Sequence, residues 1–150
     1  MIRDESLQNL VNTVKSEGIE QLAVRVVIPF AGQVLLLKRR TDDYLGDGIW
    51  ELSNGTVEPG ESLGEALTRV VQQHTGLDVV DVRSHLGSSD DVSASGQQVR
   101  QYNFVAEVVP TQQIKLTAYE TYAWADLGKD LPVSAADKAV LSNFVNGLLG

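Results

Sequence analysis

The side chains best suited to chemistry lie between residues 50 and 77, where acidic, basic and imidazole groups occur among glycines. A helix advances about 100° per residue, so positions 70, 73 and 74 share one face within an arc of about 100°. These positions hold Val70, Gln73 and His74. Magnesium needs several oxygen ligands whose negative charge offsets its own, but valine supplies no ligand, glutamine supplies a neutral carbonyl, and an imidazole suits zinc, nickel or copper better. These three side chains by themselves offer little to a hard cation.

Positive charge is concentrated where Lys38, Arg39 and Arg40 are adjacent. The whole chain carries a formal net charge of −8, whereas broad binding to nucleic-acid backbones needs clustered positive charge. A small phosphorylated ligand needs only a few arginines, so Arg25 and Arg39 are candidate phosphate contacts. A solvated strand end is the alternative for the basic cluster. The chain has no cysteine, which excludes disulfides and zinc–thiolate sites.

Three predicted helices and several strands must position these groups. The spacing of apolar residues predicts an N-terminal helix over residues 5–17 and a central helix over 62–75, which ends at Gly76 in a left-handed cap. Ser134 and Asp137 form a candidate capping pair at the start of a last helix. Apolar alternation predicts strands at residues 22–28, 34–37, 49–52, 79–82, 99–109 and 119–124. The first two of these strands are expected to form a hairpin.

The order of the elements lacks the regular strand–helix alternation of a doubly wound sheet. It predicts an α+β fold, with a mixed β-sheet flanked by helices in an α/β/α sandwich. The chain has 150 residues, which is enough to bury a core as one domain over 1–150. The polar stretch at 88–96 is expected to be a mobile loop. No secretory signal or run of roughly 18 apolar residues is evident, so a soluble cytoplasmic protein is expected.

Residues 55–77 resemble the signature of the Nudix hydrolase family. That signature is Gly, five residues, Glu, seven residues, then Arg-Glu-apolar-x-Glu-Glu-x-Gly-apolar. Gly55, Glu61 and Arg69 stand at the matching spacing, and Gly76 is followed by an apolar residue as the signature requires. The resemblance implies a Nudix fold.

The segment also departs from the Nudix signature. The three later glutamates of the signature correspond here to Val70, Gln73 and His74. The family usually has Pro-Gly-Gly ending at the first signature glycine, where this chain has Ser-Asn-Gly at residues 53–55. The segment is therefore a degenerate Nudix box, in which the fold-defining positions match and the metal-binding positions do not.

The resemblance implies a role for several of these residues. Glu61 and Arg69 are expected to form the ion pair between loop and helix, with catalysis by Glu61 as the alternative. Glu120 is a candidate general base from a late loop. The family implies Mg²⁺ or Mn²⁺ as cofactor, and the candidate ligands left at matching positions are Gly55, through its carbonyl, Gln73 and His74. For His74 the sequence favours a neutral, packed polar role over a ligand role.

The resemblance also implies a small-molecule partner, a nucleotide or nucleotide-sugar. Trp50 could stack on the base of this ligand, and packing in the core is the alternative for the Trp50 side chain. One interpretation is a weakly active or non-catalytic nucleotide-binding module. The alternative is an active, divergent Nudix pyrophosphohydrolase that uses other carboxylates to hold the metal. Neither a nucleic acid nor a membrane is expected as a partner, and the N-terminal helix is compatible with a homodimer or with a monomer.

Overall fold

The computed structural model describes residues 2–39, 50–110, 113–117, 119–127 and 130–149, so Arg40 of the predicted basic cluster lies outside the described residues. The elements follow one another in the order α1 (Asp4–Val11), β1 (Gln21–Val27), β2 (Pro29–Phe30), β3 (Gln33–Arg39), β4 (Trp50–Glu51), β5 (Ser53–Thr56), α2 (Leu63–Thr75), β6 (Val79–Val92), β7 (Gln98–Val108), β8 (Tyr119–Asp126) and α3 (Ala135–Leu149). Within these residues the strands form two four-stranded sheets. No helix in the described ranges has the length and apolar content needed to cross a membrane.

The first sheet has the strand order β5-β1-β7-β6, and the second has the order β2-β3-β4 with β8 on β3. Strands β1 and β7 are parallel and the other pairs are antiparallel, so the predicted α+β fold with mixed pairing is confirmed. The hairpin predicted from residues 22–28 and 34–37 forms only at its turn end, where the Ile28 carbonyl accepts a hydrogen bond from the Leu35 N–H at 3.0 Å. Both edges of β1 are occupied, by β5 and β7, and the chain changes sheets at Ile28, so it is β2 that pairs with β3.

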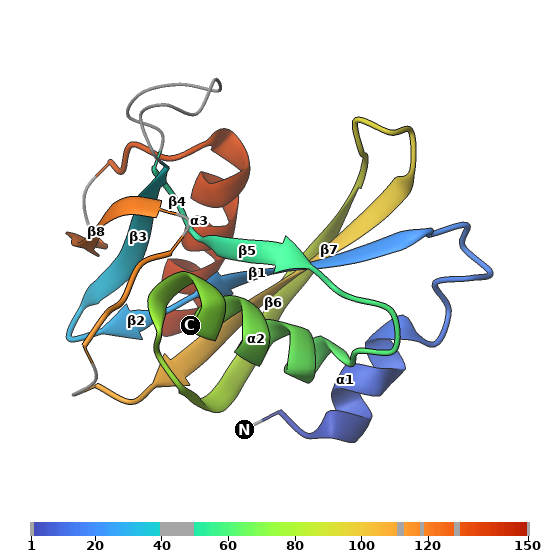
Figure 1. Ribbon diagram of the computed structural model, residues 1–150, viewed down its shortest axis with the longest axis horizontal. Helices are drawn as coiled ribbons and strands as arrows, with labels where there is room; N and C mark the ends of the chain where they lie inside the picture. The colour runs from blue at the N-terminus through green and yellow to red at the C-terminus, as the bar shows by residue number, and fades with distance from the viewer. Residues whose placement is uncertain (1, 40–49, 111–112, 118, 128–129, 150) are drawn as a thin grey trace.

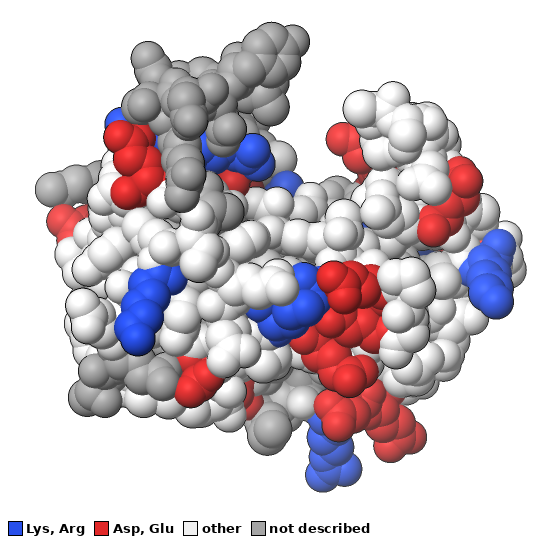
Figure 2. Space-filling view, viewed as in Figure 1, with Lys and Arg blue, Asp and Glu red and all other residues white. Residues whose placement is uncertain are grey.

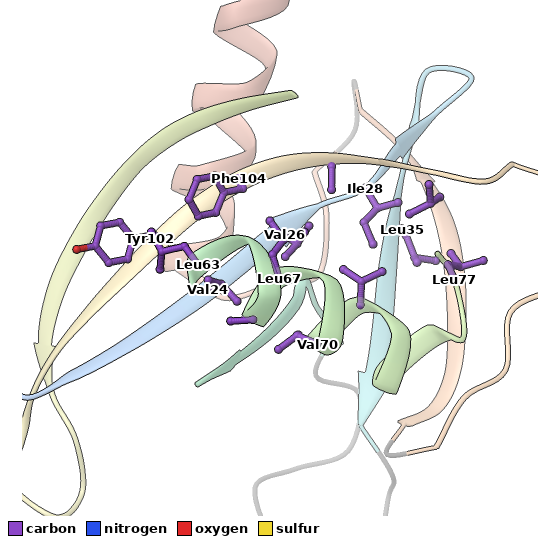
Figure 3. Packing of buried hydrophobic residues seen from close by; sticks show 14 of the residues in the cluster. Val24, Val26, Ile28, Leu35, Leu63, Leu67, Val70, Leu77, Tyr102 and Phe104 are labelled. Atoms are coloured by element: carbon purple, nitrogen blue, oxygen red, sulfur yellow. The ribbon is translucent and has the colours of Figure 1, made fainter. Parts of the chain in front are cut away.

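Helices cover both faces of the strands, with α1 and α2 on one side and α3 on the other (Figure 1). Side chains alternate across a strand, and this alternation divides the core in two. Val24 and Val26 of β1 point to the α2 side, where Figure 3 shows them beside Leu67. Val27 points to the opposite side and packs in the cluster that contains Phe144 of α3. This three-layer arrangement holds α2 firmly against the first sheet.

The central helix begins and ends close to where the sequence predicts. Ser62 is its N-cap, and its hydroxyl accepts a hydrogen bond from the Glu65 N–H while the Glu65 carboxylate accepts one from the Ser62 N–H. Such a capping box satisfies N–H groups that the first helical turn leaves unpaired. Gly76 ends the helix at φ +74°, a left-handed conformation that glycine adopts without strain.

The structure corrects the predictions for two other segments. The N-terminal helix ends at Val11 rather than near residue 17, and hydrogen-bonded turns lead on to Gly18. Polar side chains compete with helical hydrogen bonding here: Ser16 Oγ, for example, donates to the carbonyl of Thr13 at 2.8 Å. The loop predicted at residues 88–96 belongs mostly to β6, because its backbone pairs with β7 as far as Val92.

Candidate functional site

The ion pair predicted between Glu61 and Arg69 is present and joins the loop after β5 to α2. Arg69 Nε donates to Glu61 Oε2 at 2.7 Å, and Arg69 Nη2 donates to Glu61 Oε1 at 3.0 Å. This two-pronged geometry fixes both side chains. Arg69 Nη2 also donates to the carbonyl of Thr56 at 2.7 Å, and the main-chain N–H of Glu58 donates to Glu61 Oε1 at 3.0 Å. The guanidinium holds the pKa of the Glu61 carboxyl below its usual value, so the pair is fully charged at neutral pH.

Position 70, the first of the three altered signature positions, lies in the core. Val70 is 1% exposed and packs against β5 so closely that a Cβ on Gly55 would lie 2.7 Å from Val70 Cγ2. Figure 3 shows Val70 among the apolar side chains beneath α2. A carboxylate at this position would be desolvated without a partner, which costs several kcal/mol by order of magnitude. The signature glycine therefore makes room for an apolar side chain rather than for a metal ligand.

Gln73, the second altered position, is held by two neighbours. Its side-chain carbonyl oxygen accepts a hydrogen bond from Arg69 Nη1 at 3.1 Å, and its main-chain carbonyl accepts one from the Thr117 hydroxyl at 2.5 Å. The side-chain oxygen is the atom that a cation would use. A guanidinium on that oxygen opposes cation binding by charge as well as by occupying a lone pair.

His74, the third altered position, lies between β5 and β8. Its Nδ1 is 3.3 Å from Ser53 Oγ, and its ring meets the ring of Tyr119 edge-on, with centroids 5.1 Å apart and an interplanar angle of 83°. Burial lowers the pKa of the His74 imidazole, so the ring is neutral at neutral pH. The contacts of His74 are those of a packed polar residue, which is the interpretation that the sequence favours.

A polar network continues from Tyr119 across β3 and β4. The Tyr119 hydroxyl donates to Glu51 Oε1 at 2.7 Å, and Arg39 Nε donates to the same oxygen at 3.1 Å. Burial raises the pKa of the Tyr119 hydroxyl, so it is a hydrogen-bond donor at all ordinary pH values. We call Arg39, Glu51, Ser53, His74 and Tyr119 the His74 network. Its one arginine balances its one glutamate, so it presents little net charge to a ligand.

These residues do not fit magnesium. Among the residues that the structure describes, no three or more His, Asp or Glu side chains are grouped so that they could hold a metal ion. Glu51 and Glu61, which are linked to the altered face through Tyr119 and Arg69, are each engaged by an arginine. The predicted ligands Gly55, Gln73 and His74 thus provide neutral groups with neighbours of their own, where Mg²⁺ needs a nearly octahedral set of oxygens and compensating charge.

The structure places the remaining predicted site residues apart from this face. Arg25 Nε pairs with Asp137 of α3 at 2.9 Å, where the two side chains are 12% and 6% exposed, and Arg25 Nη2 donates to Gln101 at 2.7 Å. Trp50 packs against the apolar cluster on the α3 side, as its core alternative predicts. Glu120 is exposed on β8 next to Tyr119, and strand alternation turns it away from the side where Tyr119 meets His74.

Comparison with known proteins identifies the family. The sequence profile described as the NUDIX domain matches residues 20–144, so the chain belongs to the Nudix family, whose hydrolases act on nucleoside diphosphate-linked compounds and generally use divalent metals such as Mg²⁺. A MutT protein from Methanosarcina mazei Go1 is 26% identical with a TM-score of 0.72, covering 89% of this chain and 99% of that one. The Escherichia coli ORF135 protein is 23% identical with a TM-score of 0.71, covering 87% and 92%.

Two curated relatives are much longer than this chain. An Arabidopsis thaliana protein named Nudix hydrolase 2 is 35% identical over 52 residues, which are 35% of this chain and 19% of that protein. A Myxococcus xanthus protein named octanoyltransferase is 30% identical over 98 residues, which are 63% of this chain and 27% of that protein. The matched segments span roughly a quarter or less of these relatives, so the relatives' names describe activities of larger proteins.

Sequence reasoning missed most of the His74 network. Ser53 stands where the family usually has proline, and this departure is the one visible signal at that position. Glu51 and Tyr119 have no local pattern that marks them as partners of Arg39 or His74. Their contacts arise because β3 pairs with both β4 and β8, a long-range pairing that spacing along the chain does not reveal.

Proposed function

We propose that this Nudix domain binds a nucleoside diphosphate derivative and does not carry out the magnesium-dependent hydrolysis typical of its family. One observation carries the proposal: each residue of the altered helix face already has an internal partner. Val70 packs against Gly55, Gln73 accepts from Arg69, and His74 contacts Ser53 and Tyr119. Cleavage at phosphorus relies on metal ions to neutralise the attacking and leaving oxygens, and this face supplies no comparable positive charge.

The choice of ligand class rests on the fold and its neighbours. Solved structures of the same fold include a Caenorhabditis elegans Ap4A hydrolase with a TM-score of 0.68 and an Escherichia coli dihydroneopterin triphosphate pyrophosphohydrolase with a TM-score of 0.61. Both names refer to small nucleotide-like phosphate compounds. Identities of 18% and 20% establish a common fold and leave the specific ligand of this chain to experiment.

The test measures metal binding, ligand binding and turnover on the same protein. Mg²⁺ and Mn²⁺ are titrated calorimetrically, and ADP-ribose, a UDP-sugar and a dinucleoside polyphosphate are tested for binding in EDTA and for hydrolysis in excess metal. We expect binding of at least one compound in EDTA, no micromolar metal affinity and no hydrolysis above the rate in buffer. Micromolar metal binding together with turnover would establish the alternative, an active enzyme that uses other carboxylates such as Glu58 or Glu65.

A second arm of this experiment restores charge to the altered face. Gln73→Glu with His74→Glu leaves the buried Val70 in place and adds two carboxylates near Glu51. We expect this variant to gain measurable Mn²⁺ affinity. The matched control, Thr68→Glu with Gln72→Glu, adds the same charge at exposed positions of α2. Equal Mn²⁺ affinity in the two variants would show that positions 73 and 74 do not form the metal face.

A further inference from the structure

A second concave surface lies between α1, α2 and the start of β6. This groove has a volume of about 870 Å³, and the α2 residues lining it include Gly64, Thr68 and Gln72. Positions 70, 73 and 74 do not line it. The groove therefore belongs to a side of α2 other than the face that carries the family's metal ligands, and the proposed nucleotide site leaves it without a role.

The floor of the groove is apolar. Leu7 of α1 and Leu63 of α2, 4% and 3% exposed, form part of its base. Val79 and Val82 of β6 contribute half-buried apolar surface, and Val80 is 53% exposed at the same strand. An apolar surface within a concavity gains free energy when a complementary apolar side chain covers it.

The rim of the groove is acidic. Asp4, Glu5 and Glu65 line it and are exposed, and Figure 2 shows acidic side chains gathered over the start of α2 and over α1. Asp81 also lines the groove, and its Oδ1 atom is buried with no hydrogen-bond partner among the described residues. The basic residue in the lining is Arg69, and its guanidinium is engaged by Glu61, Thr56 and Gln73.

We propose that this groove binds a basic segment of another protein, in which lysine or arginine residues flank apolar side chains. The apolar side chains would cover the floor, and the cations would pair with the acidic rim, where opposite potentials favour both encounter and register. Charge complementarity selects this occupant, because anionic lipid and nucleic acid would meet a surface of their own sign.

A second copy of this chain fits the groove poorly. A two-fold interface places the same patch on both subunits, so Asp4, Glu5 and Glu65 of one copy would face the same acids of the other. Like charges brought together at an interface cost affinity. A two-fold dimer through this groove is therefore disfavoured.

The experiment uses the full chain and three synthetic peptides of equal length. The first alternates lysine with leucine, the second replaces every leucine by serine, and the third replaces every lysine by glutamate. Binding is measured by calorimetry and located by amide chemical shifts. We expect the lysine–leucine peptide to perturb α1, the first turns of α2 and residues 79–82. The serine peptide should bind at least about tenfold more weakly, and the glutamate peptide should show no binding.

Variants of the protein then separate the groove from general charge attraction. Glu5→Gln with Val80→Ser changes one rim acid and one exposed valine of the groove, and is expected to lower the affinity for the lysine–leucine peptide by about tenfold. Asp91→Asn removes the same charge at the distal end of β6 and should leave that affinity unchanged. Equal binding of the lysine–leucine and lysine–serine peptides would overturn the proposal. An unchanged affinity in the Glu5→Gln, Val80→Ser variant would overturn it too.

Discussion

Residue 55 illustrates how a signature glycine can serve packing alone. A Cβ at this position would lie 2.7 Å from Val70 Cγ2, closer than carbon atoms approach in well-packed cores. We predict that Gly55→Ala destabilises the protein by about 1–3 kcal/mol, because β5 or the Val70 side chain must move to relieve the overlap. The free energy of unfolding is measured by chemical denaturation.

Two comparisons isolate the Gly55–Val70 contact. Gly147 lies in α3, and apart from its chain neighbours and the nearby backbone of its own helix, no atom of the described residues comes within 4 Å of the point where its Cβ would lie. Gly147→Ala should therefore stabilise the protein by up to about 1 kcal/mol through helix propensity. In a Val70→Ala background the overlap is relieved, and Gly55→Ala should then lower the free energy of unfolding by a clearly smaller amount. An equal cost of Gly55→Ala in both backgrounds would show that Val70 is not the cause.

Among the elements, the loop between β5 and α2 depends on the Glu61–Arg69 pair. The two side chains are 14% and 23% exposed, so water screens the pair only in part. We predict that Glu61→Gln lowers the free energy of unfolding by about 1–2 kcal/mol, because the amide keeps the shape but removes the charge, and its NH₂ group replaces one of the two oxygens that accept hydrogen bonds from Arg69. Chemical denaturation at neutral pH measures the change.

Glu58 provides the matched control for this loop. Its carboxylate is 62% exposed and lies 3.8 Å from Arg69 Nη1, so Glu58→Gln should change stability by no more than about 0.5 kcal/mol. A comparable loss in both variants would mean that general charge in the loop, rather than the two-pronged bond to Glu61, holds it against α2. Amide hydrogen exchange in residues 57–62 should rise in the Glu61 variant alone.

The elements that the sequence predicts well are those with local causes. The start of α2 depends on Ser62 and Glu65, three residues apart, and its end depends on Gly76, so the sequence predicts α2 almost to the residue. Strand β7 is predictable because alternating apolar residues mark one face. By contrast, the full length of β6 and the existence of β5 depend on pairing with β7 and β1. The polarity of residues 88–92 gives no sign of that pairing.

The candidate site also contains some contacts that the sequence predicts and others that depend on long-range pairing. The Glu61–Arg69 pair can be predicted because the family signature fixes both positions, and the sequence favours an internal role of His74 over metal binding. Ser53 is 21 residues from His74, and sequence spacing does not identify it as a partner. Asp137 is predicted as a helix-capping residue, and its N–H does donate to Ser134 Oγ at 3.2 Å, but its buried carboxylate pairs with Arg25 across the α3 interface.

At the scale of the whole molecule, both histidines of the chain stabilise the fold in their neutral form. His74 lies against Tyr119, and His85 lies near Tyr102 and Phe104 with its Nε2 buried and without a partner among the described residues. Burial lowers the pKa of each imidazole below 6.5. The unfolded chain therefore takes up protons near that pH while the folded chain does not. Stability is fully present above the unfolded pKa and is lost as the pH falls below it.

We predict that the free energy of unfolding falls between about pH 7.5 and pH 5.5, by at most about 1.4 kcal/mol per pH unit for each histidine. The double variant His74→Gln, His85→Gln should show a clearly smaller fall over the same range, measured by chemical denaturation at constant ionic strength. Glu61, with a lowered pKa, titrates below this window. Asp137, with a pKa raised by burial, acts with the opposite sign and is present in both proteins. An equal fall in both proteins would locate the pH dependence in groups other than the two buried imidazoles.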